Sequence, residues 1–115
     1  MRFSLLAPCY VYTTHCPEGV VPFCSVQAPT ETSYILEKPQ AEAEAIPFIF
    51  ACRALWLGQP TALSMVGLTA KVSHCLAQHT IPCNVVAAYA HDYFFVPEHE
   101  AQRALELLNE VFAQG

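Results

Sequence analysis

The stretch Ser64–Pro97, SMVGLTAKVSHCLAQHTIPCNVVAAYAHDYFFVP, contains the pattern that decides the fold. From residue 67 to residue 80 its apolar side chains recur at helical spacing, and Pro82 limits the helix because residues before a proline avoid the α region. Residues 83–89 and 93–96 are rich in β-branched and aromatic side chains, with a polar turn between them. The stretch therefore predicts a helix followed by a two-stranded hairpin.

The rest of the chain supplies further strands and two further helices. Strands are expected over residues 8–14, 23–28, 33–37 and 47–57, and helices over residues 39–45 and from residue 97 almost to the C-terminus. Proline opens both of these helices, as is common at the first helical position. From residue 47 onward the order is β-α-β-β-α, and one added strand from the N-terminal part would complete a ferredoxin-like βαββαβ sheet with helices on one face.

The expected fold class is therefore α+β. Residues 1–46 are interpreted as an N-terminal strand-rich lobe, and residues 47–115 as the main domain. The length of 115 residues suits one domain, or one domain made of two small lobes. Hydrophobic residues make up 54% of the chain and charged residues only 13%, against roughly 25% charged in an average globular domain. A surface so poor in charge favours self-association, and we expect a homodimer.

Charge and hydropathy exclude two classes of partner. The net charge is −5, and the five basic residues are scattered singly, so no cationic cluster exists for a nucleic acid. No apolar run reaches the roughly 18 residues that span a bilayer. The N-terminal apolar run is too short for a secretion signal and is broken by Pro8. We expect a cytoplasmic protein whose six cysteines are reduced and mostly buried.

Two positions look suited to a ligand on physical grounds alone. Gly67 precedes the helix, where unsatisfied backbone N–H groups attract anions and a glycine lets a carboxylate approach the backbone. The alternative is that Gly67 only makes the turn into the helix. Asp92, the only aspartate, could pair with a cationic ligand group, or could be an ordinary turn residue that caps local N–H groups.

Metal binding and catalysis find little support in the sequence. His74, Cys75, His79 and Cys83 lie close together, but their spacing matches no paired zinc motif, and Cys75 falls on the apolar stripe of the expected helix. No cysteine or serine has an evident histidine base, and there is no phosphate-binding glycine loop. We expect no cofactor, no metal site and no enzymatic activity.

Arg53 lies in the middle of the long apolar strand expected over residues 47–57. A charge there must be paired, lie at an edge, or face an interface. One interpretation is an outward-facing residue on the open sheet face. The other is a contact to a ligand or to a second subunit.

Several short motifs together resemble a known family, the ACT domain. They are Val66-Gly67-Leu68-Thr69 at a helix start, Ile81-Pro82-Cys83-Asn84-Val85-Val86-Ala87, and His91-Asp92-Tyr93-Phe94-Phe95-Val96-Pro97, followed by Ala101, Ala104, Leu105 and Leu108. More narrowly, they are similar to small stand-alone bacterial ACT proteins related to the CASTOR-type arginine sensors. The resemblance covers residues 47–111 well, and the N-terminal lobe would then be a partial second ACT unit.

The resemblance implies a regulatory or sensory, allosteric module that binds a small molecule, an amino acid, between two domains or two subunits. The loop that opens the helix would take the ligand carboxylate, the strand after it would line the site, and Asp92 would face an amine or guanidinium. The implied ligand-binding residues are Met65, Val66, Gly67, Leu68, Val86, Ala87, His91 and Asp92. The alternative is a structural or protein-interaction module without a ligand.

Overall fold

The computed structural model describes residues 2–60 and 67–113. Its strands are β1 (Ser4–Thr13), β2 (Cys24–Gln27), β3 (Thr32–Glu37), β4 (Ile49–Trp56), β5 (Asn84–Ala87) and β6 (Asp92–Pro97). Its helices are α1 (Lys38–Ala43), α2 (Leu68–Gln78) and α3 (Ala101–Phe112), and a short 3-10 turn, η1 (Glu98–Glu100), precedes α3. The α+β class and the expected order of elements are confirmed.

Two compact units make up the molecule. The first combines the N-terminal residues up to Ala7 with the chain from Arg53 onward, and the second is Pro8–Cys52. Neither long strand belongs to one unit alone, because β1 and β4 each contribute residues to both. The expected domain boundary between residues 46 and 47 stays a prediction.

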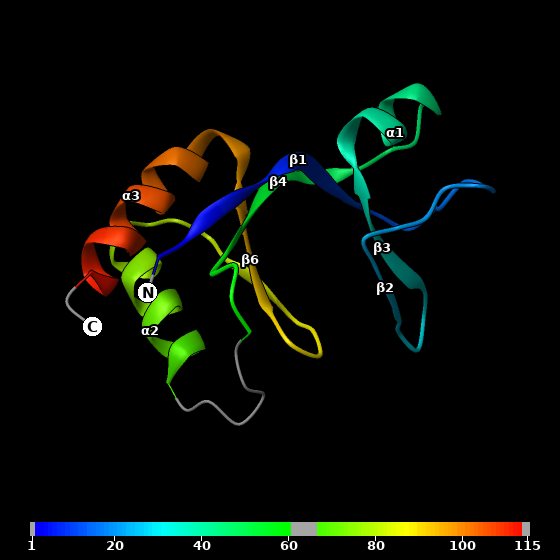
Figure 1. Cartoon of the computed structure of the whole chain (residues 1–115). Helices are drawn as coiled ribbons and strands as arrows, with labels where there is room; N and C mark the ends of the chain where they lie inside the picture. The colour runs from blue at the N-terminus through cyan, green and yellow to red at the C-terminus, as the bar shows by residue number, and fades with distance from the viewer. Residues whose placement is uncertain (1, 61–66, 114–115) are drawn as a thin grey trace. The chain divides into compact units, whose positions relative to one another are not determined.

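In the first unit the strand order is β1-β4-β6-β5. Helices α2 and α3 lie on the same side of these strands, as Figure 1 shows. This is a ferredoxin-like arrangement in which β4, α2, β5, β6 and α3 follow one another and β1 supplies the last strand. The expectation that an N-terminal strand completes this sheet is confirmed.

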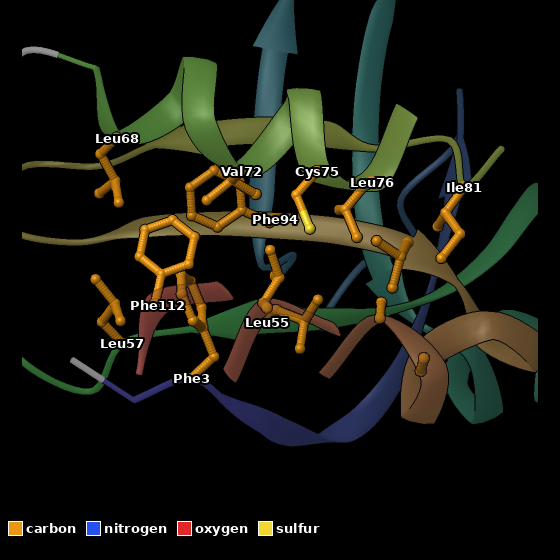
Figure 2. Packing of buried hydrophobic residues seen from close by; sticks show 14 residues of the cluster. Phe3, Leu55, Leu57, Leu68, Val72, Cys75, Leu76, Ile81, Phe94 and Phe112 are labelled. Atoms are coloured by element: carbon orange, nitrogen blue, oxygen red, sulfur yellow. The ribbon is translucent and has the colours of Figure 1, made fainter. Parts of the chain in front are cut away.

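The core of the first unit lies between the helices and the sheet. Leu68, Val72, Cys75 and Leu76 recur at helical spacing along α2 and point toward Phe94 of β6 (Figure 2). Burial of each such side chain stabilises the fold by roughly 1.5–3 kcal/mol. The remaining members are Phe3, Leu55, Leu57, Ile81, Val96, Ala101, Ala104, Leu108 and Phe112.

The N-terminal residues are attached to α3 by one side-chain amide. The Phe3 N–H donates to Asn109 Oδ1 at 2.7 Å, and Asn109 Nδ2 donates to the Phe3 carbonyl at 3.1 Å. The Phe3 ring lies edge-on to the rings of Phe94 and Phe112, with centroids 6.2 Å and 5.1 Å away. The amide pair and the ring contacts together fix the start of the chain where β1 can join β4.

The second unit repeats this strand order without the first helix. Its order is β2-β3-β1-β4, α1 connects β3 to β4, and residues 14–23 form no helix. Its core consists of Val11, Leu36, Ala41 and Ile46, against which Cys16, Val20, Tyr34, Phe48 and Ala51 pack. Cys16 and Val20 of this loop pack against the core of the second unit. In the first unit, helix α2 occupies the corresponding position in the chain order.

The hairpins β2–β3 and β5–β6 match residue for residue at an offset of 60. Cys24 pairs with Ile35 as Asn84 pairs with Phe95, and the three remaining pairs of each hairpin keep the same offset. Both turns close with the same bond: the Ala28 N–H donates to the Glu31 carbonyl at 2.8 Å, and the Ala88 N–H donates to the His91 carbonyl at 2.9 Å. The two hairpins therefore form a structural repeat.

Most element boundaries lie within two residues of the expected ones, and two differ by four residues. The first strand begins at Ser4 rather than at Pro8. The β1–β3 ladder runs only from Tyr10 to Thr13, so Pro8, which has no N–H to donate, lies outside that ladder. The last α-helix begins at Ala101 rather than at Pro97, because the chain first makes the tighter turn η1.

Candidate functional site

The start of α2 has the backbone geometry that the sequence predicted for an anion site. Gly67 has φ of +89°, and its carbonyl accepts the first helical bond, from Lys71 N–H at 2.9 Å. The N–H groups of Leu68, Thr69 and Ala70 therefore have no acceptor within the helix. Because Gly67 has no side chain, the N-cap residue cannot cap them. An anion placed there would also meet the positive end of the helix dipole.

The described residues leave the space around Gly67 open. A Cβ atom added to Gly67 would meet no atom of the described residues beyond its chain neighbours within 4 Å, yet the positive φ still disfavours any other residue. Two of the predicted site residues, Met65 and Val66, lie outside the described residues. The side chain of Leu68 is only 7% exposed and packs in the core, as Figure 2 shows. Only the backbone of Leu68 can therefore contribute to a site at this helix start.

The structure brings the other four predicted residues together at the tip of the β5–β6 hairpin. Ala87 pairs directly with Asp92, and Val86 pairs with Tyr93. Because neighbouring residues in a strand point to opposite faces, Val86 and Tyr93 share one face, and Ala87 and Asp92 share the other. Val86, His91 and Asp92 are half-buried and Ala87 is exposed.

An aromatic cluster that the sequence did not predict lies beside this tip. Trp56, at the end of β4, stacks on Tyr93 with centroids 5.8 Å apart and an interplanar angle of 12°. The His91 ring is 5.1 Å from the Trp56 ring. Tyr93 is on the sheet face opposite Phe94, and Phe94 faces the helices, so the cluster covers the face that has no helix. Predicted residue His91 thus contacts an aromatic surface rather than bare solvent.

Arg53 is paired with a backbone group. Its Nε and Nη2 atoms both donate to the Leu6 carbonyl, at 3.2 Å and 2.8 Å. Leu6 lies on β1, the neighbour of β4 in the sheet, so the guanidinium supports the contact between these two strands. A partly buried charge in an apolar strand needs a hydrogen-bonding partner, and the Leu6 carbonyl is this partner.

Three of the cysteine and histidine residues near α2, namely Cys75, His79 and Cys83, are at least partly buried, and His74 is exposed. The Cys75 side chain is in the core, and its carbonyl lies 3.1 Å from His79 Nδ1. Burial raises the pKa of the Cys83 thiol to about 11, and burial, followed by the Glu110 carboxylate, also raises the pKa of Cys75.

Within residues 2–60 and 67–113, no three side chains of His, Cys, Asp or Glu are grouped as metal ligands. No helix among these residues is both long and apolar enough to cross a membrane.

A separate cleft lies in the second unit, and no sequence pattern described above predicts it. It has a volume of about 250 Å³ and is lined by Tyr12, Thr13, Thr14, Ser33, Pro47, Phe48 and Ile49. The Thr13 hydroxyl donates to the Pro47 carbonyl at 3.0 Å and accepts the His15 N–H at 3.3 Å. Thr13 is 8% exposed, and these two bonds hold one wall of the cleft in place. A search for the 60-residue repeat would have drawn attention to this region, because it corresponds to the aromatic cluster of the first unit.

Four strands in the order β1-β4-β6-β5 with two helices on one face define the first unit as a ferredoxin-like module. The model of the ACT domain matches residues 51–110, more than half of the chain. The chain therefore belongs to the ACT domain family, and in general terms it is a regulatory, ligand-binding module. The narrower resemblance to CASTOR-type proteins stays a prediction.

Solved structures extend the similarity over nearly the whole chain. A protein of unknown function from Vibrio cholerae, described as a possible transport protein, is 31% identical, with a TM-score of 0.83 over 95% of this chain and 88% of that one. A protein from Agrobacterium tumefaciens is 14% identical, with a TM-score of 0.76 over 95% and 87%. The regulatory subunit of aspartate kinase from Thermus thermophilus, in its ligand-free form, is 13% identical, with a TM-score of 0.71 over 96% and 95%. No curated protein matches the chain.

Proposed function

We propose that this chain binds a free amino acid and that the bound amino acid regulates how the protein assembles. The observation that carries the proposal is the start of α2, where Gly67 leaves backbone N–H groups open to a carboxylate. A carboxylate bound there would accept hydrogen bonds from aligned backbone N–H groups rather than from side chains. Membership of the ACT domain family supports a ligand of this kind.

The carboxylate of the ligand needs hydrogen-bond donors, and its α-ammonium group needs an acceptor. Asp92, half-buried at the start of β6, is the candidate acceptor. Ala87 of β5, which shares a sheet face with Asp92, would then lie along the ligand, with His91 at the rim. A ligand with both charges would match this combination of helix start and carboxylate.

We place this site between two copies of the chain. Two observations support a dimer: charged residues make up only 13% of the chain, and β5, at the edge of the sheet of the first unit, leaves Val85 38% exposed. An amino acid bound across the contact would stabilise one arrangement of the two subunits, and this arrangement would be the regulatory signal.

Thermal unfolding against each of the twenty amino acids tests the proposal. An amino acid present at 100 times its Kd should add about 2.7 kcal/mol of apparent stability. Gly67→Val should remove the shift, because the side chain blocks the approach to the helix start. Gly19→Val is the matched control, since Gly19 also has a positive φ (+84°) and open space around it but lies in the other unit.

Two results would contradict the proposal. One is a folded protein whose melting temperature no amino acid changes, which would favour a structural or interaction module. The other is a ligand-induced shift that Gly67→Val leaves as large as Gly19→Val does, which would move the site away from α2. Light scattering with and without the amino acid tests the dimer separately.

A further inference from the structure

The cleft of the second unit lies where the first unit has its aromatic cluster. At the 60-residue offset of the two hairpins, Ser33 takes the position of Tyr93. In the first unit the Tyr93 ring stacks on Trp56 and fills the sheet face beside the hairpin. In the second unit the serine has no ring, and a cleft of about 250 Å³ opens at that position.

The hydroxyl groups in the cleft have different roles. Thr13 is occupied on both sides, as a donor to Pro47 and an acceptor from His15, so it holds the wall. Thr14 is exposed and Ser33 is half-buried, so both hydroxyls are accessible from the cleft. Extension of the β1–β3 register by one residue beyond the pair Thr13–Tyr34 places Thr14 opposite Ser33. Two neighbouring hydroxyl groups thus face a ligand from one side.

Three further lining residues are apolar, and a residue with strained backbone follows them. The apolar residues are Pro47, Phe48 and Ile49, and the exposed fraction of Ile49 is 73% although its side chain is large and apolar. The next residue, Phe50, has φ of +55°, which is unusual for an aromatic residue inside a strand. Its ring lies edge-on to Tyr12, with centroids 5.6 Å apart. Backbone strain of this kind clusters at functional sites.

The chemistry of the walls selects a class of ligand. None of the seven lining residues carries a formal charge, so an ion would lose hydration without gaining a partner. The volume lies below the roughly 300 Å³ at which pockets for drug-sized molecules begin. We infer that this cleft binds a small, uncharged aromatic molecule with one hydrogen-bonding group, which packs on Phe48 and Ile49 and bonds to the hydroxyls of Thr14 and Ser33. This site is independent of the amino-acid site proposed at α2.

Titration of the full-length ¹⁵N-labelled protein with indole and with phenol, followed by amide chemical shifts, tests this inference. Either probe should give saturable shifts at millimolar concentration, centred on Thr13, Thr14, Ser33 and Phe48. Indole-3-carboxylate, which has the same ring with a negative charge, should bind at least tenfold more weakly. Amides at the start of α2 should not shift, which separates this result from the amino-acid proposal.

Substitution of Ser33 supplies the decisive variant. Ser33→Tyr introduces the side chain that the repeat has at position 93 and should abolish the shifts by filling the cleft. Ser25→Tyr is the matched control, because Ser25 is in the same hairpin and pairs with Tyr34, whose side chain faces the opposite side of the sheet from Ser33. Thr14→Val retains the side-chain volume and should lower affinity about threefold to tenfold through the lost hydrogen bond.

Three results would overturn the inference. The first is the absence of saturable shifts with both probes. The second is binding of the anionic probe as tightly as of indole. The third is binding that remains unchanged in Thr14→Val and in a folded Ser33→Tyr protein. Amide shift dispersion establishes whether each variant is folded, and Thr14→Val decides the outcome if Ser33→Tyr is not.

Discussion

The indole ring of Trp56 lies nearly parallel to the phenol ring of Tyr93, with ring centroids 5.8 Å apart and 12° between the planes. This contact joins the end of β4 to the start of β6 on the face without helices. Trp56 is the only tryptophan, so its fluorescence reports directly on this part of the first unit.

Loss of the stacked ring should destabilise the first unit. Tyr93→Leu retains an apolar side chain but removes the aromatic pairing, which is worth about 0.5–1.5 kcal/mol beyond area burial. The free energy of unfolding in urea, followed by Trp56 fluorescence, should fall by about that amount. Tyr89→Leu is the control, because the exposed fraction of Tyr89 is 92% and its replacement should change stability little. Equal effects of the two substitutions would show that the stack contributes nothing.

Replacement of Phe3 should have a larger effect. Phe3 is 1% exposed and contacts two other rings, so Phe3→Ala leaves a cavity and should cost about 3–5 kcal/mol. Val21→Ala, at a position 85% exposed, should cost well under 1 kcal/mol. The measurement is urea unfolding monitored by circular dichroism. A small effect of Phe3→Ala would mean that the N-terminal residues are not an integral part of the first unit.

Because Arg53 pairs with the Leu6 carbonyl, replacement of Arg53 should lower the free energy of unfolding. Arg53→Met retains most of the aliphatic stem but removes the two donors to the Leu6 carbonyl, and should cost about 1.5–3 kcal/mol, the range for hydrogen bonds to charged groups. Arg103→Met removes a side chain that is 52% exposed, pairs with Glu100 at 3.2 Å and donates to the His79 carbonyl at 3.2 Å. Because these contacts are exposed to solvent, their loss should cost less than about 1 kcal/mol. If thermal unfolding ranks the two variants in the reverse order, the role given to Arg53 is wrong.

Alkaline pH should weaken the fold through Cys83. Burial raises the pKa of this thiol from 9.0 to about 11, so the folded state holds the proton more tightly than the unfolded state does. The contribution to stability is complete below pH 9 and is lost as the pH rises from 9 through 11. The free energy of unfolding of the wild-type protein should therefore decrease more steeply over this range than that of Cys83→Ala. Parallel pH profiles for the two proteins would contradict this assignment.

The element order could be predicted from sequence because it depends on local patterns. The apolar spacing along α2, the turn that ends at His91, and the proline at the start of α1 each specify structure over a few residues. The strand through Pro8 was missed because its tolerance depends on where the β1–β3 ladder ends. That knowledge requires the pairing of strands, which local pattern does not contain.

The site was predicted less completely, for a related reason. The family resemblance implies that Leu68 contacts the ligand with its neighbours, but the helical periodicity that includes Leu68 also places its side chain in the core. The contact of His91 with Trp56 joins residues 35 positions apart, and the cleft joins Ser33 to β1 and to the start of β4. Which side chains share a sheet face follows from register, and register across strands was not derivable from spacing alone.

A crystal structure of the protein with the amino acid that gives the largest thermal shift tests the central claim most directly. The account predicts that the ligand carboxylate accepts hydrogen bonds from the backbone N–H groups that follow Gly67, and that its ammonium group lies against Asp92. A ligand bound elsewhere, with the start of α2 empty, would contradict the account.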